Sequence, residues 1–341
     1  MGVDLGDLVK REEITLDRLA GKTVAIDAYN ALYQFLSIIR QRDGTLLMDR
    51  RGRVTSHLSG LFYRTAKLLE AGIKPVYIFD GKPPEMKRRT IEKRIEVREE
   101  AAKMWKDALE KGDVEGVRVY AQASTRLTKE MIAEAKQLLE TMGIPYLDAP
   151  SEGEAEAAYL ARKGLVDACA SQDYDSLLFG SPILIRNLTI SGKRKLPRKD
   201  IFVDVVPEMI NLEAMLKELG LDMKKLIWIG ILTGTDFNKG IRGIGPKKAL
   251  KLVKETNSLE EIVKKVNHEF EIDVLEVEKF FLEPPVVDST FEFKKPDKSK
   301  MMDFLCREHD FSTERVEGTV NALLEALNEK GTQSKLDQWF G

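Results

Sequence analysis

The segment at residues 166–175, VDACASQDYD, joins a short apolar run to two aspartates that stand one residue apart. The apolar run has the length and composition of a buried strand, whereas acids are poor strand formers and are unfavourable in a core. Asp173 and Asp175 therefore mark the place where a strand ends and a polar edge begins.

The rest of the chain supplies more strands of this kind and the helices to connect them. Short β-rich runs at 22–27, 74–80 and 144–150 predict strands, and amphipathic patterns at 55–72, 128–143 and 151–164 predict helices. We further expect a β-hairpin at 183–196 and mostly helices from 207 to 330. This alternation predicts an α/β fold with a mostly parallel central sheet and helices on both faces.

Acidic residues recur at corresponding places in this predicted sheet. Asp27, Asp80 and Asp173 each follow a strand, and Glu152 and Glu154 open the helix after a fourth strand. Because the carboxyl ends of parallel strands share one edge, these acids should lie close together. Asp148, Glu156 and Asp167 are instead expected to be turn or solvated acids.

A cluster of carboxylates cannot remain ionised without cations, since like charges raise one another's pKa. Oxygen ligands suit Mg²⁺ or Mn²⁺, and two such ions can clamp a phosphodiester for in-line attack. The chain has only 3 histidines, which disfavours a zinc site. For any single acid, a helix cap or a turn explains the position equally well.

Composition sets broader limits. With 341 residues and 43% hydrophobic content, the chain can bury a sizeable core, and its net charge of −2 neither favours nor excludes a nucleic-acid partner. Cys169 and Cys306 fit no metal spacing. We find no signal peptide and no apolar stretch long enough for a bilayer, so we expect an intracellular protein with no membrane association.

Two basic segments could contact phosphate. Lys87, Arg94 and Arg98 fall on one side of a helix after Asp80, although interleaved acids make a solvated helix the better explanation of this segment alone. The second segment, GIRGIGPKKALKLV at 240–253, places a glycine turn before a helix, where backbone N–H groups bind phosphate. A plain helix–turn–helix corner is the alternative.

Two further signals lie nearer the C-terminus. Asp236, in ILTGTDF, could reach the same metals if its region folds back against the sheet. The end of the chain has the pattern Gln-x-x-Leu-x-x-aromatic-aromatic, which suits an anchor for a hydrophobic pocket on a partner. Its residues are Gln333, Leu336, Trp339 and Phe340. A tail docked on its own domain is the alternative.

Several of these motifs together resemble one family, the flap structure-specific endonucleases of the XPG/Rad2-like 5′-nuclease superfamily, and most closely its archaeal form. The matching stretches are MGV at the start, AIDAYNALYQFL, PVYIFDGKPPEMK, APSEGEAEAAYLA, ASQDYDSLLFG, LTGTDFNKGIRGIGPKKA and QSKLDQWF. The resemblance implies a PIN-like nuclease core with a helical gateway and a helix-hairpin-helix region. Phe237 departs from it, because a tyrosine is common there in the family.

The resemblance also implies an activity and the residues that carry it. The family uses two Mg²⁺ ions, which Mn²⁺ can replace, to cut 5′ flaps at single-strand/double-strand junctions in Okazaki-fragment maturation and DNA repair, with 5′–3′ exonuclease activity besides. Its metal-binding acids correspond here to Asp27, Asp80, Glu152, Glu154, Asp173, Asp175 and Asp236.

Other roles follow from the same resemblance. Lys87 and Arg94 correspond to gateway residues that assist the chemistry, and Gly2 should lie near the site. A K⁺ ion usually accompanies the hairpin, and the tail resembles a motif that docks on the sliding clamp, PCNA. We expect DNA contacts from Tyr33, Arg64, Gly243, Gly245, Lys247 and Lys248.

The expected organisation has overlapping regions in what should be a monomer. They are an N-terminal nuclease region (1–100), a gateway (81–130), an internal nuclease region (116–258), a helix-hairpin-helix element (225–258) and a clamp-binding tail (330–341).

Three alternatives remain open at this point. A clamp-tethered DNA-binding protein could keep the fold without cutting, but would have no reason to keep seven mutually repelling acids. An aspartyl-phosphate phosphatase would use the Asp-x-Asp pair alone. A related 5′ exonuclease or bubble-cutting nuclease is the closest alternative to the flap enzyme, although the compact length of the chain favours the flap enzyme.

Overall fold

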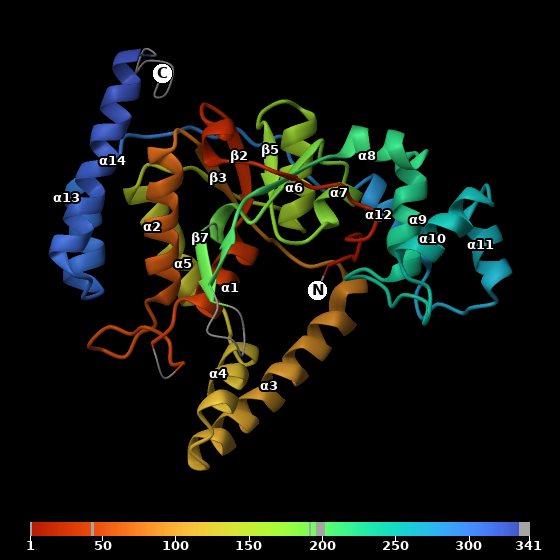
Figure 1. Cartoon of the computed structure of the whole chain (residues 1–341), viewed down its shortest axis with the longest axis horizontal. Helices are drawn as coiled ribbons and strands as arrows, with labels where there is room; N and C mark the ends of the chain where they lie inside the picture. The colour runs from red at the N-terminus through yellow and green to blue at the C-terminus, as the bar shows by residue number, and fades with distance from the viewer. Residues whose placement is uncertain (1, 42–43, 191, 196–201, 334–341) are drawn as a thin grey trace.

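The computed structural model describes residues 2–41, 44–190, 192–195 and 202–333, and its centre is a seven-stranded sheet (Figure 1). Short 3₁₀ helices join longer elements, at Leu16–Leu19, Glu85–Lys87 and Leu188–Ile190. A π-helix at Asp303–Glu308 connects α13 (Lys298–Met302) to α14 (Thr313–Gln333). In sheet order the strands are β1 (Glu12–Glu13), β9 (Glu208–Asn211), β6 (Ile183–Arg186), β5 (Ala168–Ala170), β2 (Thr23–Asp27), β3 (Lys74–Phe79) and β4 (Tyr146–Asp148).

The core of the sheet is parallel, as the sequence predicts. β2 pairs in parallel with both β3 and β5, so that Ile26 lies opposite Tyr77 on one side and Ala170 on the other. β3–β4 and β5–β6 are also parallel pairs, whereas β9 and β1 add two antiparallel strands at one edge. The carboxyl ends of β2, β3 and β5 therefore meet at a common edge.

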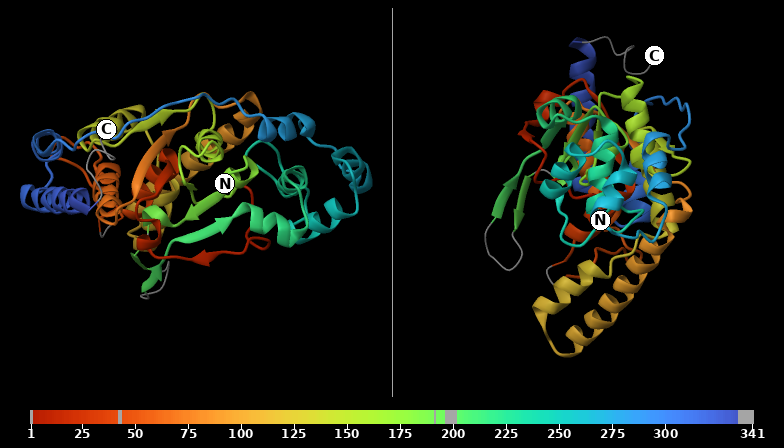
Figure 2. Two further views of the ribbon diagram at one scale, coloured as in Figure 1. Left: turned by 90° about the horizontal axis from the view of Figure 1, so that it is seen from above. Right: turned by 90° about the vertical axis from the view of Figure 1, so that its right-hand side faces the viewer.

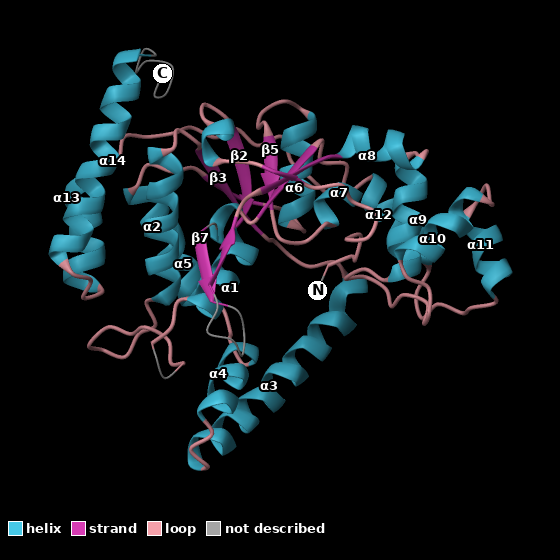
Figure 3. Ribbon diagram, viewed as in Figure 1, coloured by secondary structure: helices cyan, strands magenta, loops and turns pink. Residues whose placement is uncertain are grey.

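Helices cover both faces of this sheet because successive strand residues point to opposite faces. Val24 and Ile26 belong to a core formed with α1 (Ala28–Ile38), α2 (Ser56–Glu70), α5 (Lys129–Thr141), α13 (Lys298–Met302) and α14 (Thr313–Gln333). Ala25 points the other way and packs with apolar residues of α6 (Gly153–Arg162). Figure 3 shows these helical layers on either side of the strands.

A helical arm projects from the body below the carboxyl edge of the sheet (Figures 1 and 2). It consists of α3 (Arg88–Glu110) and α4 (Val114–Ala123), which pack along one another. Most side chains of α3 are exposed, and Ala101 and Ala108 are its buried residues. The arm lies in the chain between Asp80 and α5, within the range 81–130.

The other end of the molecule is a second helical cluster. It contains α7 (Asp175–Leu178), α8 (Leu212–Leu219), α9 (Met223–Thr233), α10 (Pro246–Lys254), α11 (Leu259–Val266) and α12 (Val274–Leu282). Beyond α12 the chain returns as an extended segment across the α6 side of the sheet, where Phe291 and Phe293 pack on the core.

The structure corrects the prediction of a hairpin at 183–196. Only Ile183–Arg186 joins the main sheet, as β6, and the short helix Leu188–Ile190 then breaks the run. β7 (Gly192–Lys195) pairs instead with β8 (Phe202–Val205) in a separate two-stranded sheet. Alternation alone could not reveal this, because it identifies strands but not their partners. Within the described ranges, no helix has the length and apolar character needed to cross a membrane.

Candidate active site

The acids singled out from the sequence meet at the carboxyl edge of the sheet. Asp27 ends β2 and caps α1, where it accepts a hydrogen bond from the backbone N–H of Asn30 at 2.9 Å. Asp80 follows β3 directly, and Glu152 is the residue before α6. We call the set the acidic rim: Asp27, Asp80, Glu152, Glu154, Asp173, Asp175 and Asp236.

A close approach between β3 and α6 joins two sides of the rim. The backbone N–H of Gly153 donates to Asp80 Oδ1 at 2.6 Å. A Cβ on Gly153 would lie 2.8 Å from that oxygen, so a side chain there would push Asp80 away. Gly153, which lies between Glu152 and Glu154, is a site residue that the acid pattern alone did not identify.

The N-terminal segment closes the rim from another side. The backbone N–H of Val3 donates to Asp175 Oδ1 at 2.6 Å, and the amide nitrogen of Gly2 lies 3.4 Å from Asp173 Oδ1. A Cβ at Gly2 would come within 2.7 Å of Asp175 Oδ2. Gly2 therefore lies at the site, as the resemblance implies.

Two basic residues at the root of the arm reach into the rim. Lys87 Nζ lies 2.5 Å from Glu152 Oε2 and 3.3 Å from Asp236 Oδ2. Arg94, in the second turn of α3, places Nη2 2.5 Å from Asp236 Oδ1. Asp236 thus does fold back to the sheet. Arg98 lies apart, with its guanidinium 4.9 Å from the ring centre of Tyr33.

The rim carries more negative charge than its surroundings favour. Burial, together with the charges of Asp80 and Asp173, raises the pKa of Asp27 well above its ordinary value. Burial and the charge of the neighbouring Asp175 also raise the pKa of Glu154 well above its ordinary value. The pKa of Asp175 rises to about 7, first through burial and then through repulsion by Asp236.

Lys87 and Arg94 offset part of this charge. Burial opposes ionisation of Asp236, yet these two cations lower the pKa of its carboxyl below the usual value. The carboxylates of Glu152 and Asp236 in turn raise the pKa of Lys87 although burial opposes it. The pKa values of Asp80 and Glu152 remain raised, mainly by burial.

These residues fit hard cations by their chemistry. Glu154 Oε1 is buried and has no hydrogen-bond partner among the described residues, which is unfavourable for an acid oxygen unless a ligand completes it. Oxygen-only donors with raised pKa values suit Mg²⁺ or Mn²⁺. As the side chains stand, no three of the described His, Cys, Asp or Glu residues already surround one metal position. Basic side chains and backbone N–H groups hold several of the oxygens instead.

Glu156 corrects a sequence prediction. It was expected to be solvated, but it is fully buried and its Oε2 accepts a hydrogen bond from the backbone N–H of Val287 at 3.1 Å. Its partner lies on the extended segment after α12, more than a hundred residues away along the chain, and no local pattern reveals such a contact. Burial raises the pKa of Glu156.

The glycine turn precedes α10, which Figure 1 shows in the helical cluster beside α9 and α11. Gly243 has a φ of +84°, a conformation that favours glycine, and Gly245 caps α10, whose first residue is Pro246. Lys248 Nζ donates to the carbonyl oxygen of Gly243 at 2.9 Å, while Lys247 Nζ lies 3.3 Å from Asp7 Oδ2. The turn and its lysines therefore occur as predicted.

The remaining predicted residues are not themselves acids of the rim. Tyr33 is on α1 and Arg64 on α2, where burial lowers the pKa of Arg64. Phe237 is buried against Phe280 and Phe281, so the hydroxyl of a tyrosine is not needed for its packing. In the tail, α14 ends at Gln333. Leu336, Trp339 and Phe340 fall outside the described residues.

Comparison with known proteins gives consistent matches across the chain. Residues 1–101 match the model of the XPG N-terminal domain, and residues 143–236 match the XPG I-region. Flap endonuclease 1 of Thermococcus onnurineus is 58% identical over 343 residues, which cover 100% of this chain and 99% of that protein.

Solved structures of similar proteins agree. A flap endonuclease-1 structure from Methanococcus jannaschii has a TM-score of 0.75 and 42% identity, covering 96% of this chain and 100% of that one. The catalytic core of Rad2, solved in complex with a DNA substrate, has a TM-score of 0.67 and 28% identity, with coverage of 93% and 97%. The similarity therefore extends over nearly the whole chain, the sheet and the helical clusters alike.

Proposed function

Because the chain belongs to the flap endonuclease family of XPG-type nucleases, we propose that it cuts DNA at the base of 5′ flaps with two Mg²⁺ ions held by the acidic rim. The protein is a structure-specific 5′-flap nuclease that acts on DNA phosphodiester bonds and depends on metal. The observation that supports the proposed site is the convergence of seven acids beneath Lys87 and Arg94.

The rim would hold the two ions through oxygens of Asp27, Asp80, Glu152, Glu154, Asp173, Asp175 and Asp236. When bound, such ions supply an activated water and stabilise charge on the leaving oxygen. Glu154 contributes a buried oxygen that has no hydrogen-bond partner among the described residues and that a cation would complete. Mn²⁺, which accepts the same oxygen ligands, should replace Mg²⁺.

Lys87 and Arg94 would hold the scissile phosphate. Both reach the rim from the start of the arm, so their positive charge lies on the side from which a phosphate would approach the acids. Lys87 is largely buried, which strengthens its attraction for a phosphate oxygen relative to that of an exposed lysine. Tyr33, on the same side, would stack on a base beside the cut.

We propose that the regions predicted from the sequence correspond to particular helices of this arrangement. We assign α3 and α4 as the gateway for the flap and α9, α10 and the turn between them as the helix-hairpin-helix element. Backbone N–H groups at Gly243 and Gly245, with Lys247 and Lys248, would hold duplex phosphates, together with a K⁺ ion. Arg64 would contact the duplex from α2.

The C-terminal tail is proposed to dock on a sliding clamp, PCNA, through Gln333, Leu336, Trp339 and Phe340. The spacing places its apolar residues on one face of a short helical turn. Removing 333–341 should abolish stimulation by the clamp and leave intrinsic cleavage by the monomeric enzyme near normal. Stimulation that survives the truncation would exclude this role for the tail.

The central test is cleavage of a 5′-labelled flap duplex with Mg²⁺, beside blunt duplex, 3′-flap and single-strand controls. We expect cutting at the base of the 5′ flap and a steep fall with salt, because phosphate contacts dominate affinity. Tight flap binding without cutting would favour a clamp-tethered binding protein. Equal cutting by Asp175→Asn would contradict the metal assignment, since this variant should bind the flap but not cleave it.

A further inference from the structure

A chain of hydrogen bonds runs from the short helix Leu188–Ile190 to two aspartates of the rim. Thr189 Oγ1 donates to Gln34 Oε1 at 2.9 Å, and Gln34 Nε2 donates to Asn30 Oδ1 at 2.6 Å. The side chain of Asn30 then donates from Nδ2 to Asp173 Oδ2 at 3.3 Å, and its backbone N–H donates to Asp27 Oδ1 at 2.9 Å.

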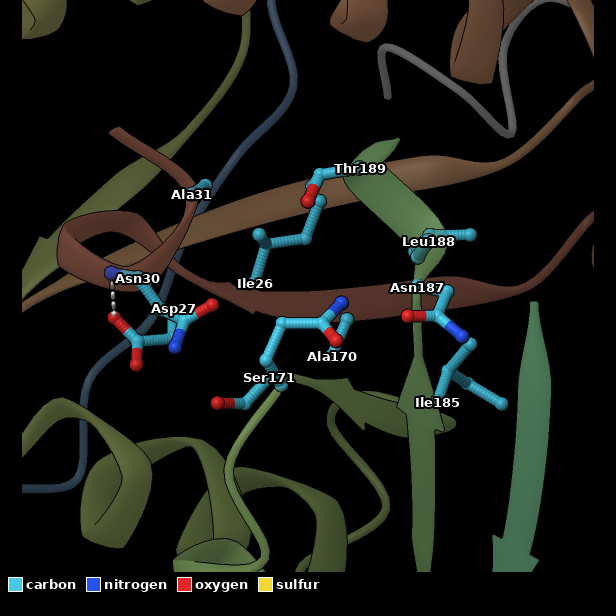
Figure 4. Close-up of a pocket in the computed structure, with 11 residues that line it drawn as sticks. Ile26, Asp27, Asn30, Ala31, Ala170, Ser171, Ile185, Asn187, Leu188 and Thr189 are labelled. Carbon is cyan, nitrogen blue, oxygen red and sulfur yellow. Dashed lines mark hydrogen bonds between the residues drawn. The ribbon is translucent and has the colours of Figure 1, made fainter. Parts of the chain in front are cut away.

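Asp27, Asn30 and Thr189 border a small pocket beside the rim (Figure 4). Asp27 and Asn30 lie together on one side of it, at the start of α1, and Thr189 enters from the segment after β6. Thr189 is buried, with 6% of its surface exposed, whereas Asn30 and Gln34 are half-buried. Water competes poorly for groups in such a place, so each orientation depends on its neighbour.

The direction of every bond in the chain is set by the carboxylate at its end. An ionised aspartate can only accept, so Asn30 must turn its NH₂ group to Asp173 and its carbonyl oxygen to Gln34. Gln34 must therefore present its own NH₂ group to Asn30, and its carbonyl oxygen faces Thr189. Thr189 must then donate, which a hydroxyl can do by rotating.

We propose that Thr189, Gln34 and Asn30 form a positioning relay that fixes the rotation of the Asp173 carboxylate for metal binding. The proposal rests on the proposed function, because it assumes that Asp173 is a ligand. The side-chain amide of Asn30 holds one oxygen of Asp173, and the relay prevents this amide from turning over, whereas the backbone N–H of Asn30 holds Asp27 independently of the relay. Partners that orient a metal ligand typically change metal affinity by about 10–100-fold when they are lost.

The substitution Gln34→Glu gives the sharpest test, because two explanations predict opposite signs. An extra carboxylate near the rim should attract a cation more strongly if simple charge decides. Under the relay, the carboxylate introduced by Gln34→Glu cannot donate, so Asn30 must turn its NH₂ group away from Asp173 and present an oxygen to it. We then expect Mn²⁺ to bind the DNA-free enzyme about tenfold more weakly.

A matched pair at the other end of the relay avoids any added charge. Thr189→Val has a similar shape but no hydroxyl, so Gln34 loses the donor that sets its orientation, and Mn²⁺ binding should weaken by about tenfold. Thr189→Ser keeps the donor and should bind Mn²⁺ as the unaltered protein does. Binding is measured from the electron paramagnetic resonance signal of free Mn²⁺, and thermal unfolding in EDTA reports on any loss of folding.

Each outcome has a definite meaning. Weaker Mn²⁺ binding by Gln34→Glu and Thr189→Val, with unchanged unfolding temperatures and recovery in Thr189→Ser, supports the relay. Equal binding by all variants, or tighter binding by Gln34→Glu, overturns it, and so does a loss that Thr189→Ser shares with Thr189→Val. Failure of the unaltered protein to bind Mn²⁺ would instead overturn the metal assignment of the proposed function.

A second readout uses catalysis. If the relay acts through metal binding, the Mg²⁺ concentration for half-maximal flap cleavage should rise in Thr189→Val, whereas kcat at saturating Mg²⁺ should recover. A kcat that stays low at saturating Mg²⁺ with an unchanged half-maximal concentration would contradict a role in metal binding.

Discussion

The acidic rim and the turn before α10 are both assigned to the DNA backbone, but their side chains are in opposite surroundings. In the rim, carboxylates from several strand ends and helix starts are buried together, and the pKa values of Asp27, Glu154 and Asp175 are raised. In the turn, Lys247 has 73% of its side chain exposed and pairs with the exposed Asp7. Repulsion between the rim carboxylates means that their ionised state depends on bound cations. The exposed lysines of the turn are solvated and need no such counterion.

This difference separates their expected contributions. Burial strengthens electrostatic effects, so a change in the rim should alter the rate of the chemical step. The exposed turn is screened by salt, so a change there should alter affinity and its salt dependence. Substitutions in the two regions can therefore be compared by which quantity they change.

The largest effect is expected within the rim itself, from the same substitution made two residues apart on α6. Glu154→Gln should reduce cleavage by more than about 100-fold, because even the loss of a group that supports a metal ligand costs about 10–100-fold. Glu156→Gln is the control. Glu156 faces Val287 rather than the rim, and a glutamine oxygen can still accept the Val287 N–H. The single-turnover rate of flap cleavage is measured for both variants. Equal losses of rate would contradict the assignment of Glu154 to the rim and of Glu156 to Val287.

The next effect concerns the cations above the rim. Lys87→Ala should reduce the single-turnover rate by about 100-fold, as removal of one donor to a reacting oxygen typically does. Lys93→Ala, on an exposed part of α3, is the control and should cut within about twofold of the unaltered rate. Flap binding measured in Ca²⁺ should change little in either variant. A loss in binding that matches the loss in rate would assign Lys87 to affinity instead.

The sequence was most informative where topology places residues together. Asp27, Asp80 and Asp173 each follow a strand, and the parallel order of β2, β3 and β5 then brings their carboxyl ends to one edge. Such an inference needs only the alternation of strands and helices. The sequence alone therefore singles out the seven rim acids. Their assignment as metal ligands comes from the family resemblance.

The sequence was least informative where the contact depends on distant segments. The burial of Glu156 depends on Val287, and the pairing of β7 depends on β8 rather than β6. Gly153 and Asn30 carry local signals that a search for acids does not use. A glycine between two glutamates at a helix start permits a close approach, and a polar residue three positions after an aspartate suits the first turn of a helix.

A third prediction concerns the stability of the rim without metal. The folded-state pKa of Asp175 is raised to about 7, so the folded protein holds a proton that the unfolded chain releases near pH ~4. This stabilisation is complete below about pH 4 and is lost as pH rises through about 7. The unfolding temperature in EDTA should therefore fall by about 5 °C between about pH 5 and pH 8.

Metal should reverse this trend, because cations favour the ionised rim. Saturating Ca²⁺ should raise the unfolding temperature more at about pH 8 than at about pH 5, as measured by differential scanning fluorimetry. Asp175→Asn removes the titrating group and should show a smaller fall in EDTA. An unfolding temperature that rises with pH over this range in EDTA would contradict the raised pKa values.

The smallest effect is expected in the turn before α10. Lys247→Ala should weaken flap binding only a few-fold and reduce the slope of log affinity against log salt by about 1, the value for one lost phosphate contact. The maximal cleavage rate should be unchanged, because the carboxylate that Lys247 pairs with, Asp7, is not one of the rim acids. Asp7→Ala is the informative counterpart. It releases Lys247 from its carboxylate partner and should tighten binding slightly, so weaker binding by Asp7→Ala would argue that the pair, rather than the lysine charge, shapes the contact with DNA.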